Sequence, residues 1–537
     1  MVTDSSLIFS IPDEPEPSYL DAVRDPTFGT WILRIANDVG RPASPLSATW
    51  DSVSRHVYSK QQPWNSTGTL LTIRNLGGVT PLILEGQSYQ PAHAPCSGYD
   101  RWDFRWHPST NHPNEQINVN SAGTELMWFD VVNCVKTRSW TLPFAANYGI
   151  GSGEGNVSAD GRYVVVASQT AMVVVDMDPH PPGAPAYPYQ RIGPVYAFPP
   201  CSLDTAQPDR CLIDDVSISP SGRFIDVKYG EIPATICDTL CDMHRIFEVD
   251  SGLVIRPHNM ASSSLRCGSF AARPNGWIYP LKHADLALDP FDNSEDVIIG
   301  GGRACPGSSL GRVVKVRLRD GKVTSLTNPT NEAGYDHGSA RNTDRPGWFY
   351  VTYSRDPLFA GRRFWGEVVA VKLDGSGSVQ RFGHYHSTQS TYNSQAQAVP
   401  SPDGRRVLVA SDWDDFCSPV CGSPRVVRDY VIDARDTGPV AVPGGPPSRE
   451  PLTLGPLHPN PFVSGFVVTI SLASAEPAAL EVFDVAGRRV LYQEVGALGA
   501  GRHELTLGLG ATSATGLYLI TLSSGRERRT ARAILIR

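Results

Sequence analysis

The sequence is poor in charge and has no long apolar run. Only 19% of its 537 residues are charged, and 47 basic against 54 acidic side chains give a net charge of -7. Binding to nucleic acid or to an acidic membrane surface needs a strongly basic patch, which this balance does not supply. No apolar stretch approaches the roughly 18 residues of a membrane-spanning helix. We therefore expect neither a nucleic-acid partner nor a transmembrane segment.

The N-terminus also lacks the basic and apolar regions of a signal peptide. The ten cysteines nevertheless favour an oxidising compartment, because an even number of cysteines suits disulfides that staple long loops. We expect a secreted or cell-surface protein whose leader was removed or missed. A cytosolic protein with ten free thiols is the alternative.

Several cysteines lie close together in the sequence. Cys237 and Cys241 are separated by three residues, as are Cys417 and Cys421. Disulfide bonding is the first interpretation. The second is a zinc site, because Cys237, Cys241 and His244 have a plausible ligand spacing, although they lack an obvious fourth ligand.

Glycine and proline are abundant, and this decides the fold class. The 49 glycines and 45 prolines are too many for a helical protein, because both residues interrupt helices, and they are typical of many short strands joined by turns. With 41% hydrophobic residues the chain can bury a sizeable core, which excludes global disorder. We expect an all-β protein.

A turn phrase of the S-x-D-G kind recurs between β-rich runs. Five clear copies end at Gly68, Gly123, Gly161, Gly222 and Gly404, and two degenerate copies begin at Leu286 and Ser339. Glycine at this position supplies the backbone conformation of a tight hairpin. With a further strand after most copies, each unit supplies about four strands, and radial repetition of such units makes a β-propeller. We predict a seven-bladed β-propeller over residues 30–436, preceded by an extended segment, 1–29; two stacked β-sandwiches are the alternative.

Two of these phrases resemble known propellers. The S-P-D-G phrase resembles the repeat of Tol-type periplasmic propellers. RHVYSKQQPWNSTGTLLTI, from Arg55, and QAVPSPDGRRVLVASDW, from Gln397, resemble the first and last blades of oligogalacturonate lyase and related lyase propellers. The resemblance covers residues 30–436 and is specific for fold rather than for activity.

The C-terminal part reads as a second domain. Residues 437–455 have a Pro/Gly linker composition, and 456–537 hold six or seven short alternating strands that predict a small β-sandwich. Four phrases in this tail, HPNPF, VFDVAGR, GRH and GLY, resemble the C-terminal sorting domain of type IX secretion cargo or the related FlgD-like immunoglobulin-type domain. The resemblance implies export through the secretion machinery. The same residues also suit ordinary turns and core positions, and both interpretations can hold.

A ring of polar residues is expected at one end of the propeller channel. Counting back seven residues from each turn glycine, and matching the degenerate copies, gives Gln61, Gln116, Glu154, Asp215, His283, His337 and Gln397. If these residues begin the innermost strands, they line a channel mouth that binds a ligand. Alternatively, strand starts are polar simply because they leave loops.

Four histidines fall in one sector of the predicted propeller. His283, His337, His384 and His386 lie in the fifth and sixth units or in the connection to the seventh. Imidazole is a common metal ligand and titrates near neutral pH, so this sector suits a divalent cation or a general base. His384 and His386, two residues apart, share one face if the segment is extended.

The lyase resemblance implies a mechanism. β-Elimination of a uronate-containing polysaccharide needs a group that neutralises the carboxylate and a base that removes the α-proton. By blade position the resemblance implies His283 as base, His337 as metal ligand or second site histidine, and Gln397 at the place of a ligand cluster, with Arg341 as charge neutraliser. His384 and His386 are further candidate ligands of one divalent cation because they lie in the same sector. The sequence departs from the lyase pattern before the last turn, where QAQAV replaces the expected histidines.

We therefore predict an exported propeller that binds or cleaves acidic polysaccharide or a surface glycan. A non-enzymatic propeller that binds a protein or glycan, with structural histidines, is the alternative.

Overall fold

The computed structural model divides the chain into two compact units, Met1–Arg435 and Asp436–Arg537. The residues that it describes are 2–77, 81–99, 103–177, 191–198, 213–229, 244–260, 263–264, 276–279, 281–302, 312–328, 330–415, 425–435, 452–472, 478–498, 501–509, 513–524 and 527–536. Most of the predicted linker lies outside them, and strand β32 already begins at Thr453. Among the described residues, no helix is long and apolar enough to cross a membrane.

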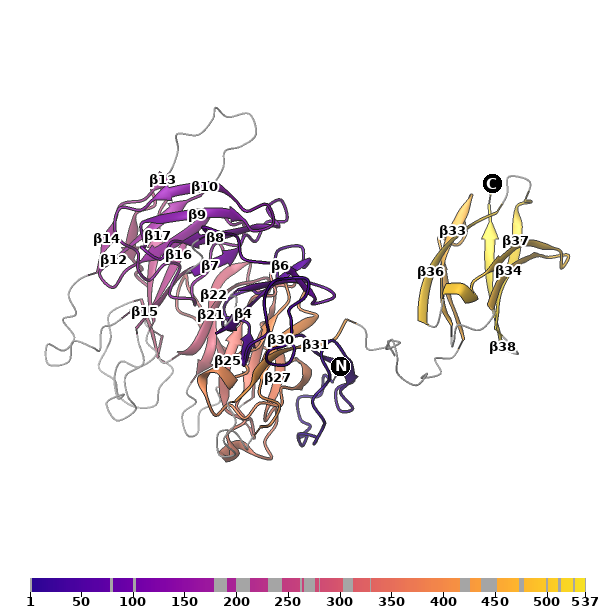
Figure 1. The fold of residues 1–537 in the computed structure, drawn as a ribbon, viewed down its shortest axis with the longest axis horizontal. Coiled ribbons are helices and arrows are strands. Elements are labelled where there is room, and N and C mark those ends of the chain that lie inside the picture. The colour runs from indigo at the N-terminus through magenta and orange to yellow at the C-terminus, as the bar shows by residue number, and fades with distance from the viewer. Residues whose placement is uncertain are drawn as a thin grey trace, which may run out of the picture. The chain divides into compact units, whose positions relative to one another are not determined.

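Antiparallel sheets follow one another along the first unit, and we call each a blade (Figure 1). Blade 1 holds β3 (Val53–Arg55), β4 (Leu70–Leu76), β5 (Leu82–Glu85) and β6 (Pro91–His93). Blade 2 holds β7 (Asp103–Trp106), β8 (Glu115–Val119), β9 (Glu125–Asp130) and β10 (Val135–Thr141). Blade 3 holds β11 (Tyr163–Ala167), β12 (Ala171–Asp176), β13 (Arg191–Ile192) and β14 (Tyr196–Ala197), inside which Val157 bridges to Val164.

The next blades repeat this arrangement. Blade 4 holds β15 (Ile213–Ile218), β16 (Phe224–Tyr229), β17 (His244–Val249) and β18 (Ile255–Pro257), with β19 (Ser263–Ser264) and β20 (Trp277–Tyr279) beside them. Blade 5 holds β21 (Leu281–Asp289), β22 (Glu295–Gly302), β23 (Val313–Arg317) and β24 (Val323–Ser325). Blade 6 holds β25 (Tyr335–Ser339), β26 (Trp348–Tyr353), β27 (Glu367–Lys372) and β28 (Val379–His384). Short 3-10 helices lie at Pro357–Phe359 and Tyr392–Ser394.

Blade 7 joins the two ends of the unit. It holds β29 (Val399–Pro400), β30 (Arg406–Ser411) and β31 (Val427–Asp433), completed by β2 (Trp31–Arg34) and β1 (Ala22–Arg24). In Figure 1 the orange β30 and β31 accordingly lie beside the indigo N-terminal region. The first residues therefore belong to the propeller instead of preceding it. A parallel pairing of β3 with β31 joins blades 7 and 1 into one nine-stranded sheet.

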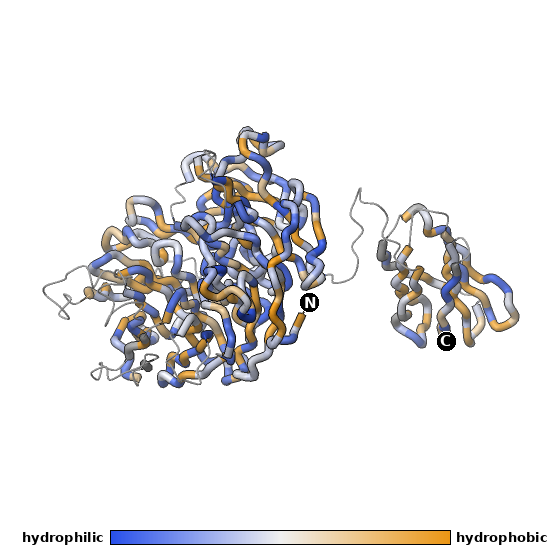
Figure 2. The backbone as a smooth tube through the Cα atoms, turned by 90° about the horizontal axis from the view of Figure 1, so that it is seen from below, coloured by the Kyte–Doolittle hydropathy of each residue, from blue (hydrophilic) through white to orange (hydrophobic). Residues whose placement is uncertain are grey.

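Hydrophobic contacts between neighbouring blades form the core, and hydrophobic stretches recur along the strands in both units (Figure 2). Val165 and Val174 of blade 3, for example, pack with Val216 and Ile225 of blade 4. The recurring turn works as predicted: Gly404 has φ +64 and donates its N–H to the Ser401 carbonyl at 2.8 Å. The all-β class and the propeller architecture are confirmed.

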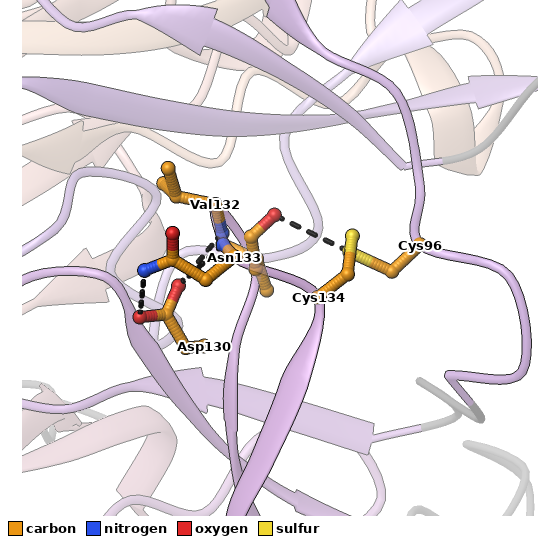
Figure 3. The surroundings of a disulfide bond; sticks show 6 residues. Cys96, Asp130, Val132, Asn133 and Cys134 are labelled. Carbon is orange, nitrogen blue, oxygen red and sulfur yellow. Dashed lines mark hydrogen bonds between the residues drawn. A yellow bond between two sulfur atoms is a disulfide. The ribbon is translucent and has the colours of Figure 1, made fainter.

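One disulfide is present among the described residues. Cys96, after β6, is bonded to Cys134, in the turn between β9 and β10 (Figure 3). Asp130 shapes this turn by accepting hydrogen bonds from the backbone N–H groups of Val132 and Asn133, at 2.9 and 2.8 Å. The other eight cysteines lie outside the described residues.

The alternative of a zinc site at Cys237, Cys241 and His244 is not supported, because His244 is not available as a ligand. Cys237 and Cys241 lie outside the described residues, but His244 is buried and both of its ring nitrogens are occupied. Nδ1 lies 2.8 Å from an Asp226 carboxylate oxygen and Nε2 lies 2.8 Å from the Leu281 carbonyl. A ring held on both sides has no nitrogen left for a metal.

The C-terminal unit consists of two packed sheets. One holds β32 (Thr453–His458), β33 (Gly465–Leu472) and β36 (Gly501–Gly508); the other holds β35 (Arg489–Glu494), β34 (Ala478–Asp484), β37 (Gly516–Ser524) and β38 (Glu527–Leu535), with a 3-10 turn at Gly496–Leu498. A shared core, including Phe466 and Ile470 from one sheet and Leu480 and Ile520 from the other, lies between them. The immunoglobulin-type assignment remains a prediction.

Candidate functional site

A segment of blade 1 enters the channel of the propeller. Arg55 pairs with Arg74 on β4, but the next pairing on that side is Trp64 with Leu71, so residues 56–63 leave the innermost strand as a long bulge. We call residues 56–63 the plug. Its residues contact other blades through His56–Asp429, Tyr58–His283, Lys60–Glu154, Lys60–Asp215, Gln61–Phe104, Gln62–Arg341 and Gln62–Pro400. The plug therefore ties blades 2 to 7 to blade 1.

Three innermost strands carry irregularities where they begin, at the end of the channel that we call the mouth. The register of β15 shifts at Asp214, that of β21 around His283 and Ala284, and that of β25 at Asp336. Bulges re-aim side chains and are common beside functional sites. His283 also has φ +40, a conformation that costs energy for a residue other than glycine. Three neighbouring blades thus direct polar groups toward the mouth.

His283, Tyr58 and His337 form the first part of the site. The Tyr58 hydroxyl lies 2.8 Å from His283 Nδ1, and the His283 and His337 rings lie 4.2 Å apart between centroids. Tyr58 meets the His337 ring edge-on at 5.5 Å. Tyr335 holds the backbone of His283 by donating a 2.8 Å hydrogen bond to its carbonyl. His283 is half-buried, whereas Tyr58 and His337 are buried, so His283 is the accessible member of this group.

The environment keeps His283 neutral. Burial lowers the pKa of His283 well below its ordinary value, and His337, Lys228, Lys282 and Lys60 lower it further by repelling an imidazolium. Burial also raises the pKa of Tyr58 well above its ordinary value. At neutral pH the pair is therefore an uncharged imidazole beside an intact phenol.

A buried charge cluster forms the second part of the site. Lys60 Nζ lies 2.6 Å from a Glu154 carboxylate oxygen and 3.1 Å from one of Asp215, while Lys228 Nζ lies 2.5 Å from one of Asp214. Only 4% of the Lys60 side chain and 1% of the Asp215 side chain are exposed. Two cations and three anions therefore share one small region, in which Lys60, Lys228 and Asp215 are buried and Glu154 and Asp214 are partly exposed.

The two central carboxyls respond in opposite directions. Burial raises the pKa of Asp215 to about 7, although Lys60 opposes the change. Burial acts in the same sense on Glu154, but Lys60 and Lys228 outweigh it and hold its pKa at about 2. For Lys60 the attraction of Asp215 and Glu154 outweighs burial and raises its pKa well above the ordinary value. One carboxyl of the cluster therefore titrates near neutrality.

The cluster does not fit a divalent cation in this arrangement. Glu154, Asp214 and Asp215 have ligand oxygens within 4.8 Å of one another, the one such group of His, Cys, Asp or Glu among the described residues. Each of these carboxylates is already paired with a lysine ammonium, however. A cation would have to enter beside two positive charges, so we assign it no role.

The predicted ring of seven residues is only partly assembled. Glu154, Asp215, His283 and His337 belong to the two groups just described. Gln61 lies in the plug and donates to the Phe104 carbonyl. Gln116 lies on β8, the second strand of blade 2, because the hairpin ending at Gly123 joins β8 to β9. The turn phrase predicts a hairpin, but it does not determine which two strands of the blade the hairpin joins.

The other predicted metal ligands do not join a cluster with His337. Arg55 donates to the Gln397 side-chain oxygen at 2.5 Å, so Gln397 is held as a structural partner. The rings of His384 and His386 lie 6.3 Å apart and nearly perpendicular, with His384 packed edge-on against Phe28. Burial lowers the pKa of His384 to about 3 and that of His386 to about 4, so both are neutral.

Arg341 is also committed elsewhere. Its guanidinium makes two hydrogen bonds, 3.0 and 2.9 Å long, to the Asp285 carboxylate and a third, 3.0 Å long, to the Leu286 carbonyl. The pair clamps blade 6 to blade 5 and leaves the arginine with its charge already neutralised. Arg341 is therefore not available to neutralise a substrate carboxylate at the mouth.

Sequence reasoning missed Tyr58, Lys60 and Lys228. The sequence contains one feature that could have indicated the plug: the polar run HVYSKQQ interrupts a segment that otherwise has the pattern of a strand. No feature of the sequence indicates the role of Lys228, since a lysine on a β-strand is usually solvated and only the fold places it among carboxylates.

Comparison with known proteins identifies the tail. Residues 456–537 match the secretion system C-terminal sorting domain. This match makes the chain a secreted or cell-surface protein and implies contact with the secretion machinery. No curated protein matches the chain.

Solved structures similar to this chain include propellers of low identity. An oligogalacturonate lyase in complex with manganese has 11% identity and a TM-score of 0.44, covering 80% of this chain and 99% of its own. The oligogalacturonate lyase of Vibrio parahaemolyticus has 10% identity and a TM-score of 0.43, covering 77% and 96%. The Cps50 (Swd1) propeller domain of Myceliophteria thermophila has 10% identity and a TM-score of 0.38, covering 70% and 97%. At these identities the likeness assigns no activity.

Proposed function

We propose that the protein is an exported β-propeller that binds uronate-containing polysaccharide at its channel mouth and cleaves it by β-elimination, with the His283–Tyr58 pair as the base. The observation that carries the proposal is the 2.8 Å contact between the Tyr58 hydroxyl and His283 Nδ1 in a partly accessible, bulged strand. A neutral imidazole accepts a proton, and the hydrogen-bonded phenol fixes the ring and stabilises the charge that develops.

The surroundings support an acidic substrate. Three lysines, Lys60, Lys228 and Lys282, act on His283, and Lys282 is exposed beside it. Lys60 and Lys228 are paired with carboxylates of the charge cluster, so Lys282 is the lysine beside His283 that a uronate carboxylate would meet, and its charge would acidify the neighbouring C–H bond. The C5 proton then moves to the His283–Tyr58 pair, its electron pair forms the C4=C5 double bond, the C4–O bond breaks, and water protonates the leaving oxygen.

The non-enzymatic alternative also has an observation in its favour. The plug enters the channel and contacts blades 2 to 7, which suits a rigid binding module as well as it suits a catalytic site. In that case the same mouth binds a glycan or a protein without chemistry.

Substitution of His283 distinguishes the two functions. His283→Ala should lower the rate of unsaturated product formation, measured by ultraviolet absorbance on polygalacturonate and on other uronate polymers, by at least about 100-fold, because a general base contributes about that much. Tyr58→Phe should cause a smaller loss. The matched control is His93→Ala, which removes a half-buried histidine of the outer strand β6 and should leave the rate unchanged.

Several results would contradict the lyase proposal. One is the absence of unsaturated product from every uronate polymer, with or without added divalent cation. Another is an equal loss of rate in the His283 and His93 variants. Retained polymer binding without product would instead favour the binding module.

A further inference from the structure

Two arginines of blade 1 lie directly opposite each other at the mouth end of the channel. Arg55 ends β3, the beginning of the innermost strand, and pairs with Arg74 on the neighbouring strand β4. Directly opposite residues of paired strands point to the same face of a sheet, where like charges destabilise the pairing. Among the described residues, neither arginine forms an ion pair. Two positive charges therefore lie beside each other without an anion.

Arg55 is the buried, structural member of the pair. It donates hydrogen bonds to the carbonyls of Asn393 and Gln395, 2.5 and 3.0 Å long, besides its bond to Gln397. These acceptors are neutral, so they satisfy its N–H groups and leave its charge uncompensated. Burial lowers the pKa of Arg55 to about 10, so it is still protonated at neutral pH. Its charge therefore adds to that of Arg74.

Arg74 is the member of the pair that a ligand can reach. Its side chain is partly exposed and forms no hydrogen bond with any residue that the structure describes. The carboxylate that acts on it, Asp103, is already bonded, because one oxygen accepts from Arg105 at 2.6 Å and the other from the Ile150 N–H at 2.7 Å. An unpaired guanidinium binds an anion, and its parallel N–H groups match the two oxygens of a carboxylate.

An exposed aromatic ring belongs to the same part of the mouth. Tyr392 is 58% exposed and begins the short 3-10 helix whose next carbonyl accepts from Arg55. Burial lowers the pKa of Arg74, and Tyr392 opposes this change more than any other group, so the phenol lies near the guanidinium. Tyr392 also acts on Tyr58, the partner of His283. A flat, exposed ring beside an anion-binding group suits an anion that is carried on a ring with apolar faces, as in an acidic sugar.

A second unpaired cation lies on another side of the mouth. Lys282, beside His283 on blade 5, is exposed, and no ion pair within the described part of the chain involves it. Arg74 lies on blade 1, which is not a neighbour of blade 5. A ligand that contacts both cations must therefore span the mouth and carry anionic groups at intervals, as a polyuronate does.

We infer that Arg74 and Tyr392 form a second subsite of the mouth, which holds another uronate residue of the chain that meets Lys282 and His283. Arg74 binds the carboxylate of this residue, and Tyr392 packs against its ring. The inference rests on the proposed function for the identity of the polymer, but binding at this subsite does not require cleavage. Recognition then depends on at least two carboxylates of one chain.

The test is calorimetric titration of the full chain carrying His283→Ala, which keeps a bound polymer uncleaved. The ligands are hexamers of galacturonate, glucuronate and mannuronate, together with their uncharged methyl esters. We expect saturable binding of at least one acidic hexamer and weaker binding of its ester. Adding Arg74→Gln should weaken binding of the acid about tenfold, as loss of a charge-assisted hydrogen bond does, and should leave binding of the ester unchanged. Tyr392→Ala should weaken binding of both forms, because the ring contact does not depend on charge.

Two matched controls remove the same chemical groups elsewhere. Arg405→Gln removes an exposed arginine beyond the end of β29, away from the mouth, and Tyr492→Ala removes a 50% exposed tyrosine of β35. Both should bind every hexamer as the His283→Ala parent does. If Arg74→Gln fails to fold, Arg74→Lys, which keeps the charge but not the paired N–H groups, should still lose part of the affinity for the acid alone.

The outcomes separate the subsite from the proposed cleavage. Arg74-dependent binding of an acidic hexamer by a protein whose wild type forms no unsaturated product would uphold the subsite and refute only the cleavage. Equal binding of acid and ester, or an equal effect of Arg74→Gln and Arg405→Gln, would overturn the subsite even if the wild type forms product. Tighter, Arg74-dependent binding of a sulfated neutral hexasaccharide than of any uronate hexamer would overturn the assignment of a carboxylate.

Discussion

Lys60 compensates the buried charges of the channel, and Lys60→Met tests this role. The change keeps most of the side-chain volume but removes the ammonium that lies 2.6 Å from Glu154 and 3.1 Å from Asp215. Breaking a buried ion pair by removing one partner costs about 3–5 kcal/mol, because the other charge stays buried. With an unfolding entropy of about 2.1 cal/mol/K per residue, the 435-residue unit has about 0.9 kcal/mol/K. We therefore expect the Tm to fall by about 3–6 °C.

The effect of Lys60→Met on the Tm should depend on pH, and the pKa of Asp215 gives the direction of that dependence. The pKa of Asp215, about 7, exceeds its ordinary value of 3.8, so its contribution to stability is present in acid and is lost as the pH rises toward 7. Lys60 limits that rise in pKa. Without Lys60 the pKa of Glu154, now held at about 2, rises, so the variant should already melt lower at about pH 5; the pKa of Asp215 also increases further, so the Tm difference should be largest at about pH 8.

The control is Lys136→Met, which breaks the exposed 2.6 Å pair with Glu125 and should cost less than about 1 kcal/mol. Calorimetric or circular-dichroism melts between these pH values provide the measurement. An unchanged Tm, or an equal fall at both pH values, would refute the reasoning. The variant should also gain a response to metal: millimolar Ca²⁺ or Mn²⁺ should raise its Tm, but not that of the wild type, because three carboxylates then face a single lysine.

Two further changes test the framework of the propeller. Cys134→Ser opens the disulfide that spans 38 residues and should cost about 2–4 kcal/mol, and reductant should lower the wild-type Tm at least as far as this substitution does; a wild-type Tm that ignores reductant would contradict this. Glu367→Gln leaves Arg381 buried without its anion and should cost about 3–5 kcal/mol in chemical unfolding, whereas Glu481→Gln, in an exposed pair, should cost less than about 1 kcal/mol; equal costs would show that burial does not matter.

The propeller was predictable because its signals are local and repeated. A Ser-Pro-Asp-Gly turn specifies a hairpin wherever it occurs, as the φ of +64 at Gly404 shows. Repetition of the turn then specified the architecture. The same locality explains the misplacement of Gln116, because the hairpin before Gly123 carries the same signal as the innermost hairpins although it is the second in its blade.

The N-terminal residues show the limit of this approach. Ala22–Arg24 is too short to read as a strand, and it becomes β1 only because β2 offers a free edge after pairing with β31. That edge exists only once the propeller has closed. Circular closure is a property of the whole fold, and a local pattern does not contain it.

The sequence by itself determined the all-β class, the repeated blades, the exported tail and the placement of His283 and His337 in one sector. Only the tertiary structure decided which polar groups meet. It brought Lys60 from blade 1 between carboxylates of blades 3 and 4, and it paired Arg341 with Asp285 away from the mouth. The physical reason is that local propensity acts over a few residues. Burial, charge pairing and pKa depend instead on residues that are far apart along the chain until the fold assembles them.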